Sequence, residues 1–235
     1  MPSHLTRKEL KQDNVALRVE ETFDFFTTHR QQTIRIGGAV LALILIVAAT
    51  LYYRSYEQGV REQQLGDAIA LQAAPVGAPP PNGGPSFPNE PAKKDAVAKA
   101  YAKIVAEHGG SNEAYIAEYT LASLDMDAGK FDAARTKYQD VADHAGANYA
   151  SLAKLSLAQL AAVQNKTAEA QTLLKDLIDH PTDLVSKNQA TFELAKVLAP
   201  TQPAEAKKLL TPLASAASDY SQAASTALGE LQQQK

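Results

Sequence analysis

The chain has 235 residues, a formal net charge of −3, no cysteine and no tryptophan. The absence of cysteine excludes disulfides, thiolate metal sites, a cysteine nucleophile and a lipid-modified N-terminal cysteine. The slightly acidic balance gives no electrostatic case for nucleic acid as the main partner. Helix-favouring alanine, leucine, glutamine and lysine are abundant, and runs of alternating β-branched residues are missing, so we expect an all-α protein.

A single transmembrane helix is predicted at residues 36–53. This stretch, IGGAVLALILIVAATLYY, carries no charge. As a helix it is roughly 27 Å long, close to the hydrocarbon thickness of a bilayer. Arg35 and Arg54 bracket it, and Tyr52 and Tyr53 fall where an interfacial aromatic belt would lie. A cleaved signal peptide is the alternative, but the leader is long and no small-x-small cleavage site follows the apolar stretch.

Lysine and arginine are unevenly distributed about this stretch. Those before it are Arg7, Lys8, Lys11, Arg18, Arg30 and Arg35, whereas up to residue 73 only Arg54 and Arg61 follow it. The positive-inside rule therefore predicts that residues 1–35 are a cytoplasmic tail and that the rest of the chain lies outside. In a bacterium this describes a single-pass inner-membrane protein with a periplasmic C-terminal domain.

The tail itself has a helical pattern. Val15, Val19, Phe23 and Phe26 share one face of a helix. This indicates either a short amphipathic helix on the membrane surface or a partly ordered tail that continues toward the apolar stretch.

Two segments separate the predicted transmembrane helix from the rest. Residues 54–73 favour a helical extension of it. Residues 74–91 hold seven of the twelve prolines and several glycines, which indicates an exposed loop or spacer. A PxxP ligand at Pro85–Pro88 is the alternative interpretation of this loop.

A helical pattern repeats every 36 residues in residues 92–235. His108, His144 and His180 show the interval most plainly. The same shift aligns a small position, an apolar position four residues later and another seven residues later, which is the stripe of a helix packed on one side. These aligned sets are Ala98, Ala134, Ala170 and Ala206; then Ala102, Tyr138, Leu174 and Leu210; then Val105, Val141, Leu177 and Leu213.

Further helices are predicted between these, at 112–127, 148–163 and 184–199. Turn signals within each helix pair are Gly129, Asn165 and Thr201, and those between pairs are Gly109–Gly110, Gly146 and Pro181. The histidines therefore fall at the ends of second helices, where an imidazole can cap carbonyl groups. A shared metal site is the alternative, but histidines one helix pair apart would be roughly 18–20 Å apart, far beyond the ~2 Å of a zinc–nitrogen bond.

The segments GKFDAARTKYQDVADHAG and NKTAEAQTLLKDLIDHP carry a specific resemblance. Each looks like the second helix of a tetratricopeptide repeat. The first segment has Ala134 as the small residue, Tyr138 as the aromatic one and Phe131 at the turn, and the second repeats the frame with Ala170 and Leu174. The period of 36 rather than ~34 and the missing first-helix tryptophan depart from that pattern. The resemblance implies a transmembrane helix followed by a tetratricopeptide-like solenoid of helix pairs.

That resemblance also implies a groove for a protein partner, lined by the first helices of the pairs. The residues expected there are Ile116, Tyr119, Ser123, Leu152, Leu155 and Gln159. The alternative is that several of them are core residues that face a neighbouring helix.

No motif for catalysis stands out in the chain. It has no glycine-rich phosphate loop, no HExxH and no GxSxG. Acidic residues such as Asp125, Asp127, Asp140 and Asp143 are expected on solvated helix faces. We therefore expect no enzyme activity, no cofactor and no metal site.

The lead-in ETFDFFTTHRQQTIRIGGAVLALILI, together with the layout of tail, single transmembrane helix and external repeat domain, resembles one family. The chain is similar to the ancillary Sec translocon subunit family, YfgM-like inner-membrane proteins, although the proline-rich insert is a departure. The resemblance implies that the external domain associates with the translocon and with periplasmic chaperones. The alternatives are a scaffold for another envelope complex, such as a division or secretion machine, and an unrecognised hydrolase.

Overall fold

The computed structural model describes residues 30–81, 83–216 and 218–233, and these residues form helices and no strand. The prediction of an all-α chain is therefore confirmed for this part of the molecule. The chain divides into two compact units, Met1–Gly59 and Val60–Lys235. The tail residues from Val15 to Phe26, for which an amphipathic helix is one interpretation, lie outside the described residues.

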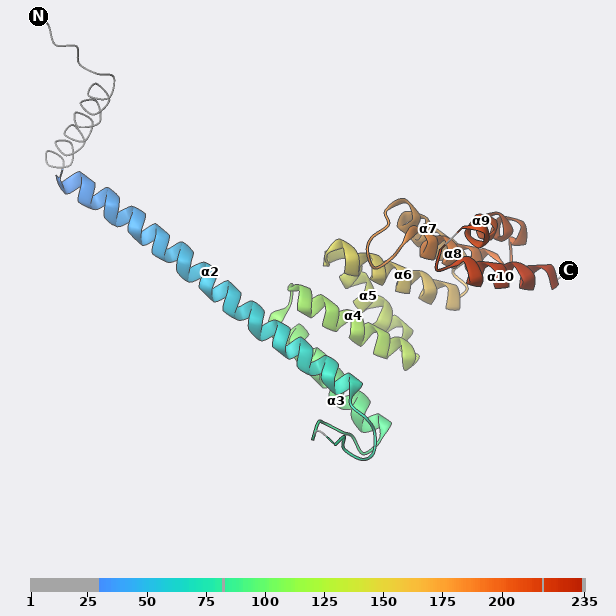
Figure 1. Ribbon diagram of the computed structural model, residues 1–235, viewed down its shortest axis with the longest axis horizontal. Coiled ribbons are helices and arrows are strands. Elements are labelled where there is room, and N and C mark those ends of the chain that lie inside the picture. Colours follow the sequence, from blue (N-terminus) through green and yellow to red (C-terminus); the bar gives the residue numbers. More distant parts are fainter. Residues whose placement is uncertain (1–29, 82, 217, 234–235) are drawn as a thin grey trace, which may run out of the picture. The chain divides into compact units, whose positions relative to one another are not determined.

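Helix α2 runs without interruption from Arg30 to Ala73 (Figure 1). It contains both the apolar stretch 36–53 and the predicted extension 54–73. Its most apolar window has a mean hydropathy of 2.4 and none of that window is buried in the protein. The helix is thus long and apolar enough to cross a membrane.

The last residues of α2, from Val60 to Ala73, pack within the second unit. They lie against helix α3 (Glu90–His108), where Ala68, Val97, Tyr101 and Ile104 are buried together. The second unit therefore begins well before residue 92, where the repeat domain is predicted to start.

Two polar contacts reinforce this packing. The Tyr101 hydroxyl donates to Gln72 Oε1 over 2.8 Å. Arg61 Nε donates over 3.1 Å to Glu113 Oε2 of helix α4 (Asn112–Asp127). The end of α2 is consequently tied to both α3 and α4.

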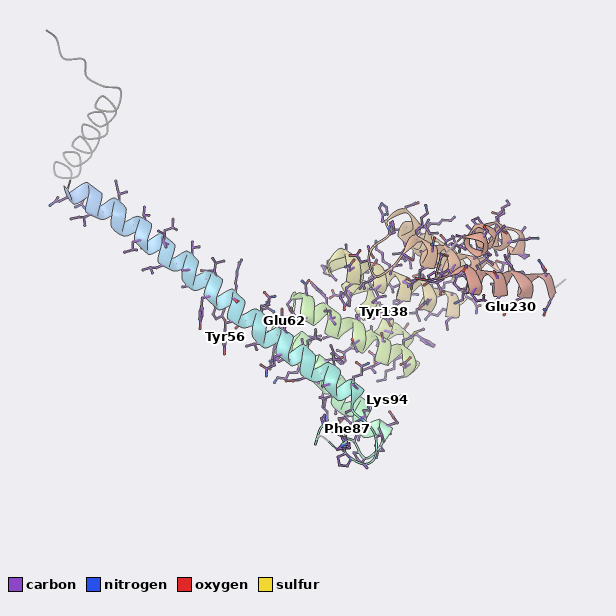
Figure 2. The ribbon with its side chains drawn as sticks, viewed as in Figure 1. Tyr56, Glu62, Phe87, Lys94, Tyr138 and Glu230 are labelled. Carbon is purple, nitrogen blue, oxygen red and sulfur yellow. The ribbon has the colours of Figure 1, made fainter. Side chains whose placement is uncertain are left out.

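The loop of residues 74–89 joins α2 to α3. Its two ends meet in a parallel bridge, in which the amide of Gly77 donates to the Phe87 carbonyl over 2.8 Å and the amide of Phe87 donates to the Pro75 carbonyl over 3.1 Å. Gly77 has a φ of 102°, a conformation that suits glycine. Figure 2 labels Phe87 at this closure.

The remaining helices follow one another in space as they do in sequence (Figure 1). Each packs against the next, and α4 also contacts α6. Their bounds are Phe131–His144 for α5, Ala147–Val163 for α6, Thr167–Asp179 for α7, Lys187–Leu198 for α8, Pro203–Ser215 for α9 and Ser221–Gln233 for α10.

The repeated stripe is buried in three alternate helices, α5, α7 and α9. The small residues Ala134, Ala170 and Ala206 are each 0% exposed. The positions four and seven residues later are also buried: Tyr138, Leu174 and Leu210, then Val141, Leu177 and Leu213. This is the burial that the 36-residue alignment predicts for these helices.

In α3 the alignment is wrong by one residue. The buried residues are Val97, Tyr101 and Ile104, whereas Ala102 is exposed. The core stripes of α3 and α5 are therefore 37 residues apart. Because one residue turns a side chain by roughly 100° about a helix axis, aligning the chain on its histidines selects the wrong face of α3.

Helix α8 also begins later than predicted. Its first residue is Lys187 rather than residue 184, because Ser186 caps the helix and its Oγ accepts the amide of Gln189 over 3.1 Å. The preceding loop is held by Thr182, whose amide donates to the Val185 carbonyl over 2.9 Å.

Two of the three predicted turns within pairs share one geometry. Gly129 and Asn165 both have left-handed backbones, with φ of 72° and 59°. The amide of the residue after each donates a hydrogen bond to a carbonyl of the preceding helix. Lys130 donates to Asp125 and Lys166 donates to Ala161, each over 2.8 Å. This is a Schellman motif. Thr201 at the third turn has no left-handed φ, so that turn is built differently.

The three histidines lie at helix ends but have different partners. Nδ1 of His144 is 3.0 Å from the Asp140 carbonyl oxygen and Nδ1 of His180 is 3.1 Å from that of Asp176, one turn back in each helix. His108 instead places Nε2 3.1 Å from Oε1 of Gln64 in α2, which fits the one-residue shift in α3. Among the described residues, no group of three or more His, Asp or Glu side chains is arranged to hold a metal ion.

Replacing all three histidines with glutamine is expected to preserve helix content. His144 and His180 should each lose a capping term of about 0.3–1 kcal/mol, with the lower end for exposed positions such as His180, whereas His108 should lose its contact with Gln64. Titration calorimetry with zinc on the wild-type and triple-variant proteins provides the check. Tight stoichiometric zinc binding that the variant loses would overturn the view that these residues only cap helices.

Candidate partner-binding surface

An open hollow lies where the N-terminal ends of α4 and α6 meet the loop before α8. Its volume is about 540 Å³, and no charged residue lines it. Leu184 contributes a large apolar side chain that is 42% exposed. The lining residues are Asn112, Tyr115, Ile116, Ala145, Gly146, Ala147, Asn148, Tyr149 and Leu184.

A cluster of aromatic rings supports the wall of this hollow. The ring of Tyr119 lies 5.4 Å from that of Tyr138 and 6.3 Å from that of Tyr149, in tilted and edge-on arrangements that aromatic pairs favour. The hydroxyls of Tyr119 and Ser156 are 3.0 Å apart, and those of Ser123 and Tyr138 are 2.9 Å apart. These contacts join α4, α5 and α6, so the hollow has a rigid base.

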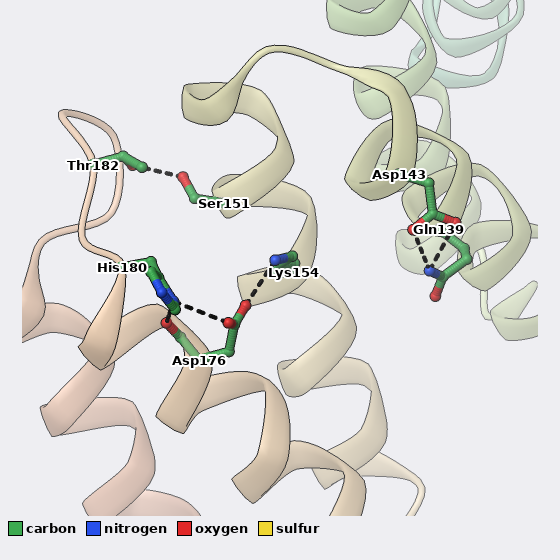
Figure 3. A network of polar contacts seen from close by, with 7 residues as sticks. All are labelled: Gln139, Asp143, Ser151, Lys154, Asp176, His180 and Thr182. Atoms are coloured by element: carbon green, nitrogen blue, oxygen red, sulfur yellow. Dashed lines mark hydrogen bonds and ion pairs between the residues drawn. The ribbon is translucent and has the colours of Figure 1, made fainter.

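The loop that carries Leu184 is anchored to α6 by a contact between Ser151 and Thr182 (Figure 3). The hydroxyls of Ser151 and Thr182 are 2.6 Å apart, and Thr182 Oγ1 also accepts the amide of Val185 over 3.2 Å. Val185 is fully buried while its neighbour Leu184 is exposed. The loop is therefore fixed on α6, with its apolar side chain left at the surface.

A polar network ties α6 to α7 beside this loop. Lys154 Nζ donates to Asp176 Oδ2 over 2.7 Å, and Nδ1 of His180 is 3.1 Å from Asp176 Oδ1 (Figure 3). The hydrogen bond from Lys154 is the main reason that the pKa of Asp176 is lowered, and His180 adds to it.

A second cavity of about 290 Å³ lies between α6, α7 and α8. Apolar residues form most of its wall, and Gln159, Glu193 and Lys196 are its polar members. Lys196 Nζ donates to Glu193 over 3.1 Å and lies 5.8 Å from the centre of the Phe192 ring.

The six residues predicted to line a groove do not form one surface. Ile116 lines the first hollow and Gln159 the second. Leu155, at 4% exposure, belongs to the core, so the groove prediction does not hold for it. The other three are half-buried and contact neighbouring helices: Tyr119, Ser123 and Leu152.

Sequence reasoning missed Tyr115, Tyr149 and Leu184. Tyr115 and Tyr149 each fall near the start of a predicted first helix, which was a usable signal. Leu184 had no such signal, because it was assigned to the first turn of a helix that begins three residues later.

A carboxyl group between α4 and α5 has an unusual proton affinity. Burial, and then repulsion and hydrogen bonding from Asp140, raise the pKa of Glu118 to about 7, against the opposing charges of Lys137 and His144. The Asp140 carboxylate is itself 3.1 Å from Nδ1 of His144.

Glu118→Gln is expected to stabilise the protein at pH 8 by about 1 kcal/mol. Glu118 binds its proton more tightly when folded than when unfolded, so its contribution to stability is full below the unfolded pKa of 4.5 and is lost as the pH rises through about 7. The difference between variant and wild type should therefore vanish near pH 4. Thermal unfolding from pH 4 to 8 tests this, with Glu230→Gln, at an exposed position of α10, as the control. A stabilisation that is equal at both ends of the range would contradict the assigned pKa.

No protein-family model, no curated protein and no solved structure matches this chain. The resemblance to translocon-associated proteins therefore has no support beyond the residues themselves. The surface has two hollows with mostly apolar walls on a packed helical frame.

Proposed function

We propose that this protein is a membrane-anchored module for protein–protein interaction. In this proposal residues 36–53 of α2 span the bacterial inner membrane, residues 1–35 are cytoplasmic and the helical pairs form a tetratricopeptide-like domain in the periplasm. The observation that carries the proposal is the rigid, uncharged hollow around Tyr149 and Leu184, on a chain that also has a helix long enough to span a membrane. The proposed role requires no cofactor, metal or catalysis.

The burial pattern supports a repeat architecture. Fully buried alanines recur at the same place in α5, α7 and α9, and each helix packs on the next. Stacked helix pairs of this kind present extended surfaces to other proteins. The buried stripes of α3 and α5 are 37 residues apart, which is the main departure from the tetratricopeptide pattern. In this proposal the domain is therefore a divergent member of such an architecture.

Translocon subunits, periplasmic chaperones and translocating polypeptides are the partners we favour. This choice rests on the resemblance of the lead-in sequence and layout to ancillary translocon subunits. A scaffold for a division or secretion complex is the second candidate, because it would use the same apolar hollows and the same anchor.

Site-specific photo-crosslinking in living cells tests the choice of partner. A photoreactive phenylalanine analogue at Tyr149 should give adducts with translocon subunits or chaperones. The same analogue at Thr172, exposed on α7, should not. Adducts with division proteins alone would favour the second candidate. Equal adduct yields at Tyr149 and Thr172 would show that the hollow is not the binding site.

A reporter fused after Lys235 tests the orientation. Alkaline phosphatase, which needs an oxidising compartment, should be active there, and a reporter that works only in the cytoplasm should be silent. The opposite result would reverse the topology drawn from the lysine and arginine distribution.

A further inference from the structure

Polar groups that are free to bind a ligand lie among the apolar residues of the hollow of about 540 Å³. The side-chain amide of Asn112 and the hydroxyls of Tyr115 and Tyr149 make no hydrogen bond within the described part of the chain. The Asn148 side chain makes one, from its Nδ2 to Asp183 Oδ2 over 3.5 Å. Amides and hydroxyls beside an apolar wall suit a polypeptide, whose backbone offers donors and acceptors next to its side chains.

A carboxylate stands at one edge of this hollow. Asp183 directly precedes Leu184 in the loop before α8, and both residues are exposed. Among the described residues Asp183 forms no ion pair, not even with Lys187, the cation closest to it in sequence, and its hydrogen bond from Asn148 is long. The contacts of Thr182 fix the loop on α6, so the carboxylate keeps its place beside the apolar wall.

Two more carboxyl groups lie one helical turn from the hollow. Glu118 follows the lining residue Tyr115 by three positions in α4, and Asp140 faces it from α5. Burial, and then the Asp140 carboxylate, raise the pKa of Glu118 to about 7, although Lys137 and His144 oppose this shift. A cation supplied by a partner would relieve the repulsion between the two carboxyl groups.

These charges discriminate between classes of partner. Carboxylates at the edge of a site repel anionic lipid head groups and acidic polypeptides, and they attract lysine and arginine. The wall of the hollow is apolar and uncharged, so it favours a large aliphatic or aromatic side chain. The combination suits a polypeptide that carries both features close together.

We propose that the hollow binds a polypeptide segment in which a large apolar side chain is followed closely by lysine or arginine. This inference rests on the proposed role in protein–protein interaction and specifies the chemistry of the partner. The apolar side chain enters between Tyr149 and Leu184, and the free amide and hydroxyl groups bind the backbone beside it. The basic side chain then lies against Asp183, in the negative field to which Glu118 and Asp140 contribute.

Fluorescence anisotropy with labelled peptides tests this on the purified full-length protein in detergent. The first peptide is Gly-Ser-Leu-Phe-Lys-Lys-Ser-Gly. In a second peptide glutamate replaces both lysines, and in a third serine replaces both the leucine and the phenylalanine. The first peptide should bind several-fold more tightly than either of the others. If the second bound as tightly as the first, the role of the carboxylates would be refuted, and a third peptide of equal affinity would refute the role of the apolar wall.

Variants at exposed positions locate the binding to the hollow. Asp183→Lys should remove most of the preference for the lysine peptide over the glutamate peptide, whereas Asp132→Lys, the same charge reversal in the first turn of α5, should leave it intact. Leu184→Ser should weaken binding of the first peptide several-fold. Val163→Ser, which removes an exposed apolar side chain beside the second cavity, should not. Equal effects of each variant and its control would overturn the proposal.

Photo-crosslinking at Tyr149 in cells separates this inference from the proposed function. If that position gives protein adducts but the first peptide binds no better than its matched peptides, the interaction role stands and the chemistry assigned to the partner is wrong. If Tyr149 gives no adducts and the first peptide is not preferred, both the interaction role of the hollow and the assigned chemistry are wrong.

Discussion

Leu174→Ala is expected to lower the free energy of unfolding by about 2–5 kcal/mol. Leu174 is 1% exposed and belongs to the largest buried cluster, which joins α6 to α10. It takes the place in α7 that Tyr138 has in α5. Because it also borders the 290 Å³ cavity, its loss enlarges an existing hollow that water can enter, which favours the lower half of that range.

Thermal unfolding of the full-length protein in detergent, followed by circular dichroism, measures this effect. For a unit of this size each kcal/mol moves the melting temperature by roughly 2–4 °C. Val163→Ala is the matched control, because Val163 is 60% exposed and surface changes usually alter stability by less than ~0.5 kcal/mol. If both variants melted together, the core assigned to α7 would be wrong.

The sequence pattern predicted the buried face correctly for helices that pack on one side only. It predicted the wrong buried face where contact with another helix selects between two apolar stripes. In α5, α7 and α9 a polar outer face leaves a single apolar stripe, so the buried residues of each helix can be assigned from the amino-acid sequence. In α3 the alternating alanines and valines allow two neighbouring stripes. Contact with Ala68 and Gln72 of α2 selects the one that includes Tyr101.

The candidate surface was less predictable for a related reason. Helix α6 is apolar on most of its circumference and has buried residues at eight positions, so no periodicity separates Leu155, which is in the core, from Gln159, which is at the surface. The hollow at Tyr149 depends on three segments far apart in the chain. Its position relies on the Ser151–Thr182 contact, and no local pattern encodes such a pairing.

Ala170→Leu is expected to destabilise the protein by about 1–3 kcal/mol through overpacking. Ala170 is 0% exposed, in a helix that packs against both α6 and α8. Ala134 and Ala206 have the same burial at the same place in α5 and α9, so the small side chain sets how closely each second helix approaches its neighbours. A leucine there requires α7 to move outward or neighbouring side chains to leave their preferred rotamers.

Ala168→Leu makes the same change on the same helix, two residues earlier, at an exposed position. Alanine and leucine differ little in helix propensity, so this control should stay within ~0.5 kcal/mol of the wild type. The melting temperature should therefore fall by roughly 2–12 °C for Ala170→Leu alone. An equal melting temperature for the two variants would show that the recurring alanine does not set the spacing between helices. The recurring buried alanine would then no longer support a repeat architecture.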